Sequence, residues 1–194
     1  MHKRSLGSVL LLCSGLALST VSVATESYTV DPTHTYPNFT INHLGFSMMH
    51  GRFNKTEGRL EIDWEKRTGV VEIVIDAESI DTGFRKRDDH LRSPDFLNAA
   101  EFPEITYRST RLTIASDGKS ATVEGRLTIM DVSKAVTLEV DSINCGDHPM
   151  KKGTYVCGFN ATSTIKRSDF GITYALPAVG DEMVLNIGIE AVRD

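Results

Sequence analysis

The sequence predicts an all-β protein, either a sandwich or an antiparallel barrel of about eight strands, with a short helical insertion. Most of the chain beyond residue 24 alternates apolar and polar residues, and turn-forming residues separate the alternating runs at regular intervals. Helical signal is confined to residues 1–24 and to one stretch, residues 85–105. A closed barrel of this size leaves no exposed strand edges and has room for one ligand or for a packed core.

The first half of the chain predicts five strands. Residues 58–64 give the clearest pattern, because Leu60, Ile62 and Trp64 share one face and charged residues share the other, as in a half-buried antiparallel strand. The next strand carries β-branched residues on one face, which favours the same structure. The five strands are expected at residues 28–30, 38–42, 51–54, 58–64 and 70–76.

Five more strands are expected after the helical stretch. Ser116-Asp117-Gly118-Lys119 is typical of a hairpin turn, and the runs on both sides of it alternate. The connection between residues 167 and 181 is irregular and contains Pro177 and Gly180. These strands are expected at residues 105–114, 121–130, 135–143, 155–166 and 183–192.

The stretch from residue 85 to residue 105 interrupts the strand pattern with dense charges and two prolines. Leu91 falls one helical turn from Arg87 and Asp88, so a short helix here would have a charged face and a narrow apolar edge. Ser93 or Asp95 can cap a second short turn that runs to residue 100. An insertion of this kind between strands usually closes or lines a site.

Residues 1–24 have the pattern of a secretory signal peptide. Two basic residues precede an apolar run at residues 6–18, and a small-residue cleavage motif follows it. We expect cleavage between Ala24 and Thr25, which leaves one exported domain over residues 25–194. The alternative is an uncleaved anchor, but the apolar run is shorter than the roughly 20 residues of a transmembrane helix.

The charge balance argues against two classes of partner. The chain has 21 Lys and Arg residues and 26 Asp and Glu residues, and removal of Lys3 and Arg4 leaves 19 basic residues and a net charge of −7. An acidic exported protein is a poor candidate for binding nucleic acid or an anionic membrane surface.

Two cysteines, Cys145 and Cys157, remain in the predicted mature chain. An exported protein meets an oxidising compartment, so a disulfide is the expected state, and it would join the ends of two adjacent strands. A metal or redox pair is the alternative. That alternative is weaker, because the spacing is not CxxC and only His148 is suitably placed beside the cysteines.

Catalytic signatures are absent from the sequence. It contains no GxSxG elbow, no HExxH pair, no phosphate loop and no dinucleotide fingerprint. Asp88, Asp89 and His90 could supply a general base, but the arginines beside them favour a charge network at a barrel rim.

A metal site is also weakly indicated. His34, His43, His50 and His90 could gather on a metal, but no two of them have ligand spacing within one strand. The simpler interpretation is a set of histidines bonded to backbone groups or carboxylates, and we expect no metal and no cofactor.

Bulky apolar side chains gather near the irregular segments, and they fit either an ordinary core or an apolar tunnel for a lipid tail. The adjacent residues Met48 and Met49 suit an adaptable lining, and barrel mouths are favoured ligand sites. An arginine or histidine near the mouth could hold a phosphate or a quinone oxygen by charge-assisted hydrogen bonds. The candidate ligand-binding residues are Phe39, Ile41, His43, Leu44, Phe46, Met49, Trp64, Arg87, His90, Leu91, Arg92, Phe96 and Phe170.

Several of these residues fall in motifs that resemble those of the YceI-like family of bacterial periplasmic proteins. The longest is Arg87-Asp88-x-His90-Leu91-Arg92-Ser93-x-Asp95-Phe96-Leu97, which leads into Phe102-Pro103. The other matches are Tyr28-x-Val30-Asp31-x-x-His34, Asn38-Phe39-x-Ile41-x-His43-Leu44-Gly45-Phe46, Gly51-x-Phe53, Gly125-x-Leu127-Thr128 and Asp169-Phe170-Gly171-Ile172. The resemblance covers essentially all of the predicted mature chain.

The resemblance implies a lipocalin-like, extended antiparallel β-barrel with a helical insertion. It implies a long pore that binds polyisoprenoid chains, such as isoprenyl pyrophosphates or the tail of ubiquinone. It also implies a periplasmic location and often a homodimer, and it brings no established catalytic activity. The cysteine pair is not part of the family pattern.

We therefore expect a periplasmic carrier that holds a long-chain isoprenoid lipid or quinone in the barrel pore. Two alternatives remain open. One is a stress-related structural barrel with a filled core and no ligand. The other is an enzyme that acts on a similar lipid through His90 and Asp88 or Asp89.

Overall fold

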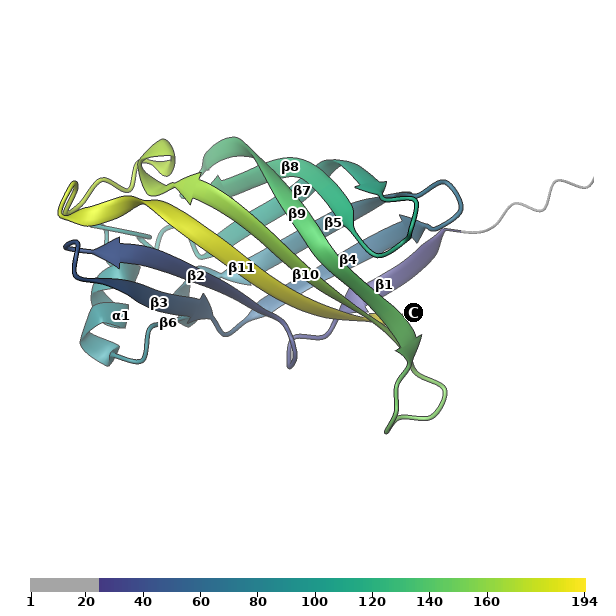
Figure 1. The fold of residues 1–194 in the computed structure, drawn as a ribbon. Helices are drawn as coiled ribbons and strands as arrows, with labels where there is room; N and C mark the ends of the chain where they lie inside the picture. The colour runs from purple at the N-terminus through teal and green to yellow at the C-terminus, as the bar shows by residue number, and fades with distance from the viewer. Residues whose placement is uncertain (1–24) are drawn as a thin grey trace, which may run out of the picture.

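Eight antiparallel strands close into a barrel in the computed structural model, which describes residues 25–194 (Figure 1). The ring closes because β1 pairs with β4 on one side and with the end of β11 on the other. The strands in ring order are β1 (Glu26–Val30), β4 (Thr56–Asp63), β5 (Thr68–Asp76), β7 (Glu104–Ile114), β8 (Ala121–Ile129), β9 (Val132–Asp147), β10 (Tyr155–Lys166) and β11 (Val179–Arg193). The predicted eight-stranded barrel is confirmed, and the predicted signal peptide lies outside the described residues.

Three further strands extend the sheet beyond β11. β2 (Tyr36–His43) pairs with the first part of β11, from Val179 to Gly188, and β1 pairs with its last part, from Ala191 to Arg193. β3 (Ser47–Phe53) and the two-residue β6 (Ile80–Asp81) continue outward from β2. One edge of β11 is thus shared by two strands in succession, so the barrel is closed by β1 at one end and by the β2–β3 hairpin at the other.

A buried threonine satisfies the backbone where β11 passes from one neighbour to the next. Glu190 lies at this junction, and its amide donates to Thr35 Oγ1 at 3.1 Å while the Thr35 hydroxyl donates back to the Glu190 carbonyl at 3.3 Å. The same carbonyl accepts the Asp31 amide at 2.8 Å. The side chain of Thr35 therefore replaces the backbone partner that the break between β1 and β2 removes.

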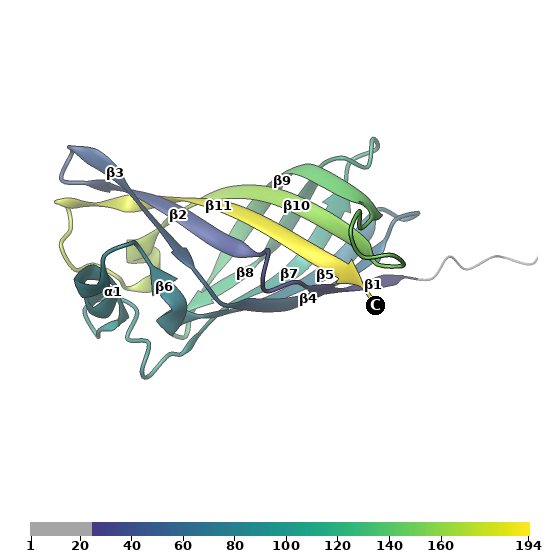
Figure 2. The same ribbon diagram turned by 90° about the horizontal axis from the view of Figure 1, so that it is seen from below.

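The helical insertion lies at one end of the barrel. α1 (Arg85–Arg92) carries Asp88 in its first turn, where a negative charge stabilises a helix, and the Asp88 carboxylate accepts the Thr82 amide at 2.9 Å. Figures 1 and 2 place α1, the β2–β3 turn and the connection between β10 and β11 together at this end. We call it the α1 end; the opposite end, where β1 begins and β11 finishes, is the terminal end.

Two short 3₁₀ segments, η1 (Ala77–Ser79) and η2 (Arg167–Phe170), complete the described elements. The predicted turn that follows the helix is present as well, since the Phe96 and Asn98 amides both donate to the Ser93 carbonyl. The sequence pattern missed β6, and it placed the starts of β3 and β11 four residues too late. β6 and the start of β11 pair with strands that are distant in the sequence, whereas the start of β3 pairs with β2 in a local hairpin.

The terminal end contains a tightly packed core. Tyr28, Ile62, Cys157 and Ala191 are completely or almost completely buried there. Trp64 seals this end by donating its indole Nε1 hydrogen to Glu26 Oε2 at 2.9 Å and to the Tyr28 hydroxyl at 3.1 Å. Burial, followed by the hydrogen bond with Glu26, raises the pKa of Tyr28 to about 12.

The predicted disulfide is present. Cys145 on β9 and Cys157 on β10 lie directly opposite each other in the strand register, with a Cα–Cα distance of 4.0 Å. The bond joins two adjacent strands at the terminal end, as the sequence predicted.

Candidate ligand-binding site

The half of the barrel near α1 is hollow. It contains a cavity of about 390 Å³, within the size range of small-molecule sites. Its wall is built mainly from apolar side chains that point inward from strands on all sides of the barrel, among them Ile73, Ile105, Leu127, Leu138, Ile165 and Ile187. The cavity occupies only one half, because the packed core fills the terminal end.

The side chains along β11 show this division most clearly. Met183, Leu185, Ile187 and Ile189 point into the barrel but are only half-buried, because they line the cavity. Ala191, further along the same strand, is fully buried in the packed end. Four apolar side chains thus keep accessible surface inside the protein, where a hydrocarbon could cover them.

Aromatic packing positions the wall near the β2–β3 hairpin. Phe39 on β2 lies opposite Gly51 on β3, and a Cβ atom at Gly51 would come within 2.3 Å of Phe39 Cζ. Only glycine at this position lets the Phe39 ring lie flat against β3. The ring then packs against Phe53, with a centroid distance of 6.1 Å.

Polar groups on the cavity wall concentrate at the α1 end. Arg87 lines the cavity and donates from Nε and Nη2 to the side-chain and main-chain oxygens of Thr82, each at 2.7 Å. His90 also lines it, and its Nε2 lies 2.9 Å from Asp95 Oδ2. The His90 ring meets Phe96 and Tyr174 edge-on at centroid distances of 5.0 and 5.1 Å. Arg87, His90 and the two aromatic rings form one side of the mouth.

A buried arginine holds the connection that carries Tyr174. Arg167 donates to four main-chain carbonyls, those of Gly180, Ile172, Tyr174 and Val179, at 2.8 to 3.1 Å. These bonds fold residues 171–180 into a fixed connection between β10 and β11. Burial lowers the pKa of Arg167.

Eight of the thirteen residues predicted for the site line the cavity. They are Phe39, Ile41, His43, Met49, Arg87, His90, Leu91 and Phe96. Their role in binding stays a prediction, but the structure brings them together from β2, β3, α1 and the turn after α1.

The other five predicted residues lie elsewhere. Leu44 and Phe46 are exposed at the β2–β3 turn, and Trp64 belongs to the packed terminal end. Phe170 is almost fully buried and does not line the cavity, and neither does Arg92, whose Nε donates to the Glu78 carbonyl at 2.7 Å. Replacement of Trp64 or Phe46 is therefore no test of the cavity.

The sequence missed most of the wall because the wall is made of ordinary strand residues. Alternation identifies the inward face of Ile73, Leu127 or Ile187, but it does not distinguish a residue that lines a cavity from one in a packed core. Arg167 was missed because an isolated arginine carries no motif of its own. Tyr174 gave no signal, since it lies within the irregular connection between residues 167 and 181.

The three candidate residues of the enzyme alternative make separate contacts. Asp88 is buried and bonded to Thr82, whereas Asp89 lies 3.1 Å from Arg92 Nη1 and 3.9 Å from Arg85 Nε. His90 is bonded to Asp95 instead of to either aspartate. This geometry fits the charge network at a barrel rim that the sequence favoured.

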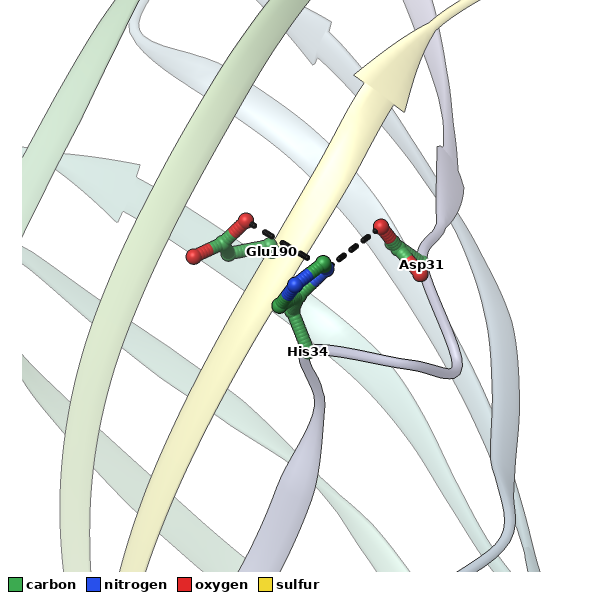
Figure 3. A group of neighbouring side chains, drawn as sticks. All are labelled: Asp31, His34 and Glu190. Atoms are coloured by element: carbon green, nitrogen blue, oxygen red, sulfur yellow. Dashed lines mark hydrogen bonds and ion pairs between the residues drawn. The ribbon is translucent and has the colours of Figure 1, made fainter. Parts of the chain in front are cut away.

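The four candidate metal histidines are also not gathered. Within residues 25–194, the group of ligand-type side chains close enough for a metal is Asp31, His34 and Glu190, which contains one histidine (Figure 3). His34 Nδ1 lies 2.9 Å from Asp31 Oδ2 and 4.0 Å from Glu190 Oε2.

Hydrogen bonds within the β1–β2 turn explain this group without a metal. The Thr33 hydroxyl and amide both donate to Asp31 Oδ1. The bonds from Thr33, followed by the bond from His34, lower the pKa of Asp31 to about 2, and the bond to Asp31 raises the pKa of His34. We assign Asp31, Thr33 and His34 as a hydrogen-bonded turn, which contacts β11 where His34 Nδ1 lies 4.0 Å from Glu190 Oε2.

Comparison with known proteins identifies the family. The sequence model of the protein family described as YceI-like domain matches residues 28–191 of this chain. The chain belongs to the YceI-like family. Protein YceI of Salmonella arizonae is 37% identical over 197 residues, which cover all of this chain and 99% of that protein.

Solved structures agree on the fold. Burkholderia cenocepacia BcnA has a TM-score of 0.71 at 23% identity, with 83% of this chain and 98% of that chain covered. A polyisoprenoid binding domain from Saccharophagus degradans has a TM-score of 0.60 at 15% identity, with 86% and 98% covered. The YceI-like barrel with its helical insertion is therefore the fold of this chain. Among the described residues, no helix is both long and apolar enough to span a membrane.

Proposed function

We propose that this YceI-like protein is a carrier that holds the tail of a long-chain isoprenoid lipid in the cavity near α1. The observation that carries the proposal is the set of inward, half-buried apolar side chains along β11. Covering apolar surface contributes about 25 cal/mol for each Å² removed from water, so a hydrocarbon tail is the ligand that this wall stabilises best.

The head group would lie at the mouth beside Arg87, His90 and His43, which line the α1 side of the cavity. The bonds from Arg87 to Thr82 use Nε and Nη2, so its Nη1 group is left to donate to a ligand oxygen. Charge-assisted hydrogen bonds of this kind suit the pyrophosphate of an isoprenyl pyrophosphate, and the histidines suit a quinone oxygen of the ubiquinone type. Both head groups belong to the proposal.

Two further observations support the ligand class. The sequence motifs resemble those of a family whose members bind polyisoprenoids, and the family model matches nearly the whole described chain. The Saccharophagus degradans domain of the same fold is described as polyisoprenoid binding.

The proposal places the carrier in the periplasm. The predicted signal peptide supports export, and the Cys145–Cys157 disulfide suits an oxidising compartment. We also expect a homodimer, which sedimentation velocity at several protein concentrations would test.

A cavity-filling substitution tests the proposed site. In Leu138→Trp, the larger side chain would occupy space that the tail needs, so the affinity for an isoprenyl pyrophosphate should fall at least about tenfold. Val70→Trp is the matched control, because Val70 is exposed on the outside of β5. Isothermal titration calorimetry measures both affinities, and thermal melts confirm folding. Equal affinities of folded Leu138→Trp and wild-type protein would remove the cavity from the proposal.

A further inference from the structure

Five large apolar side chains are exposed at the α1 end. Leu44, Phe46 and Met48 belong to the β2–β3 hairpin, Phe84 is the N-cap residue of α1, and Tyr174 lies between β10 and β11. Phe46, at the hairpin turn, is 88% exposed. We call these five residues the apolar rim. Figures 1 and 2 both place the three segments at the same end of the barrel.

The apolar rim is continuous with the mouth of the cavity. The Leu44 amide donates to the Ala178 carbonyl at 3.0 Å, which ties the hairpin turn to the connection that carries Tyr174. Tyr174 itself lines the cavity and contacts His90 on α1. The Phe84 ring lies 5.8 Å from the guanidinium of Arg87, another residue of the cavity wall.

The charges around the apolar rim differ from those of the whole chain. Residues 36–53, 83–87 and 171–180 contain no Asp or Glu, although residues 25–194 carry a net charge of −7. The same segments contain four basic side chains, and the Arg85 side chain is 93% exposed. The nearest exposed acid on α1, Asp89, is paired with Arg92 and Arg85. The segments that carry the apolar rim are therefore apolar and basic, and the exposed Asp95 beside the mouth is paired with His90.

We propose that the apolar rim docks on the surface of a lipid bilayer, with the β2–β3 turn inserted among the head groups. Exposed aromatic and aliphatic side chains bordered by Arg and Lys are what a protein needs to lie in a bilayer interface with phosphate groups around it. The docked mouth faces the bilayer, so a lipid tail passes into the cavity without crossing water. The transfer of a lipid tail from the bilayer to the cavity rests on the proposed carrier function. The docking on the bilayer does not depend on that function.

Vesicle co-flotation tests the docking. The mature protein is floated with vesicles of phosphatidylcholine containing phosphatidylglycerol, and its partition coefficient is compared with that of Phe46→Ser. Loss of one inserted phenylalanine should lower partitioning about tenfold or more. Met150→Ser is the matched control, because Met150 is 87% exposed on the β9–β10 connection at the terminal end. This variant should partition like the wild type.

A second arm separates docking from lipid binding. Affinity for farnesol, a short isoprenoid alcohol, is measured in solution, where Phe46→Ser should match the wild type within about twofold. Flotation that requires Phe46, in a protein that binds no isoprenoid, would support docking and contradict the carrier function. The docking would be overturned if the wild-type protein did not float with the vesicles. It would also be overturned if Phe46→Ser and Met150→Ser floated equally well. If the protein did not float and instead formed a dimer that was lost in Phe46→Ser, the apolar rim would be the contact with a second copy. This result would also overturn the docking.

Discussion

Two buried threonines differ in their hydrogen bonding. Thr35 makes two hydrogen bonds to the backbone of Glu190, whereas the hydroxyl of Thr56 has no partner among the residues that the structure describes. A buried hydroxyl stabilises a fold only when it is hydrogen-bonded, so the two residues should respond differently to the same change.

Replacement of each threonine by valine tests this difference. Thr35→Val should lower the free energy of unfolding by about 1–3 kcal/mol, because the Glu190 amide loses its hydrogen-bond acceptor. Thr56→Val should be neutral or should stabilise by up to about 1 kcal/mol, since the lost hydroxyl is unpaired. Urea denaturation measures both changes, and each variant serves as the control for the other. Equal losses in the two variants would contradict the assignment.

The Asp31–His34 pair should give a pH-dependent contribution to stability. The pKa of Asp31 is lowered to about 2, so the stability it adds is present above its ordinary value near 4 and is lost as the pH falls toward 2. The pKa of His34 is raised in the folded protein. Its contribution to stability is therefore complete below about pH 6.5 and is lost as the pH rises through the pKa of the folded state. The pair should therefore contribute most between about pH 4 and pH 6.

The variant Asp31→Asn should remove this contribution. Its loss of unfolding free energy relative to wild type should be greatest at pH 4 to 6 and smaller on both sides, as measured by urea denaturation from about pH 2 to pH 8. Glu57→Gln on an exposed position of β4 is the control. A difference that does not vary with pH would show that the pair is not the cause.

At the scale of elements, the segment between β10 and β11 depends on one side chain. Arg167→Met would leave four carbonyls without their donor, so unfolding free energy should fall by about 3 kcal/mol or more. For a domain of this size, each kcal/mol lowers the melting temperature by about 2–4 °C. Arg111→Met is the matched control, because Arg111 makes an exposed ion pair with Glu124, and exposed ion pairs contribute little to stability. Similar melting temperatures for the two variants would contradict this role.

The sequence predicted individual strands better than the relation between them. Ten of the eleven strands, α1 and the disulfide follow from local patterns in the chain. The division of β11 between β1 and β2 depends on pairing between residues more than 130 positions apart, for example Tyr28 with Arg193, and no local pattern encodes it. That division determines which end is packed and which is hollow.

The size and aromaticity of a side chain were poor guides to the site, because neither shows at which end of the barrel the residue lies. Trp64, Phe46 and Phe170 looked like candidate lining residues, but one seals the terminal end, one is exposed and one is buried in η2. The charged motif after residue 85 was a better guide, because polar groups on a barrel are needed where the barrel opens. Arg87, His90 and Leu91 of this motif line the cavity, although Arg92 does not, and a role of these residues in binding stays a prediction.

At the scale of the whole molecule, the barrel divides into two parts with different roles. The terminal end, with its packed core and disulfide, supports the fold, and the α1 end combines the cavity, the polar mouth and the apolar rim. The net charge of −7 predicted no contact with an anionic membrane, but that number averages over both ends. The acid-free segments around the mouth lead to the opposite inference for that end alone.

The central claim is that the hollow half of the barrel holds an isoprenoid tail. Mass spectrometry of an organic extract, taken from protein purified from the cells that produce it, tests this claim most directly and also identifies the head group. The account predicts about one isoprenyl pyrophosphate or quinone per binding site. An extract without such a lipid, repeated after isoprenoids have been offered to the purified protein, would contradict the account and favour a structural barrel without a ligand.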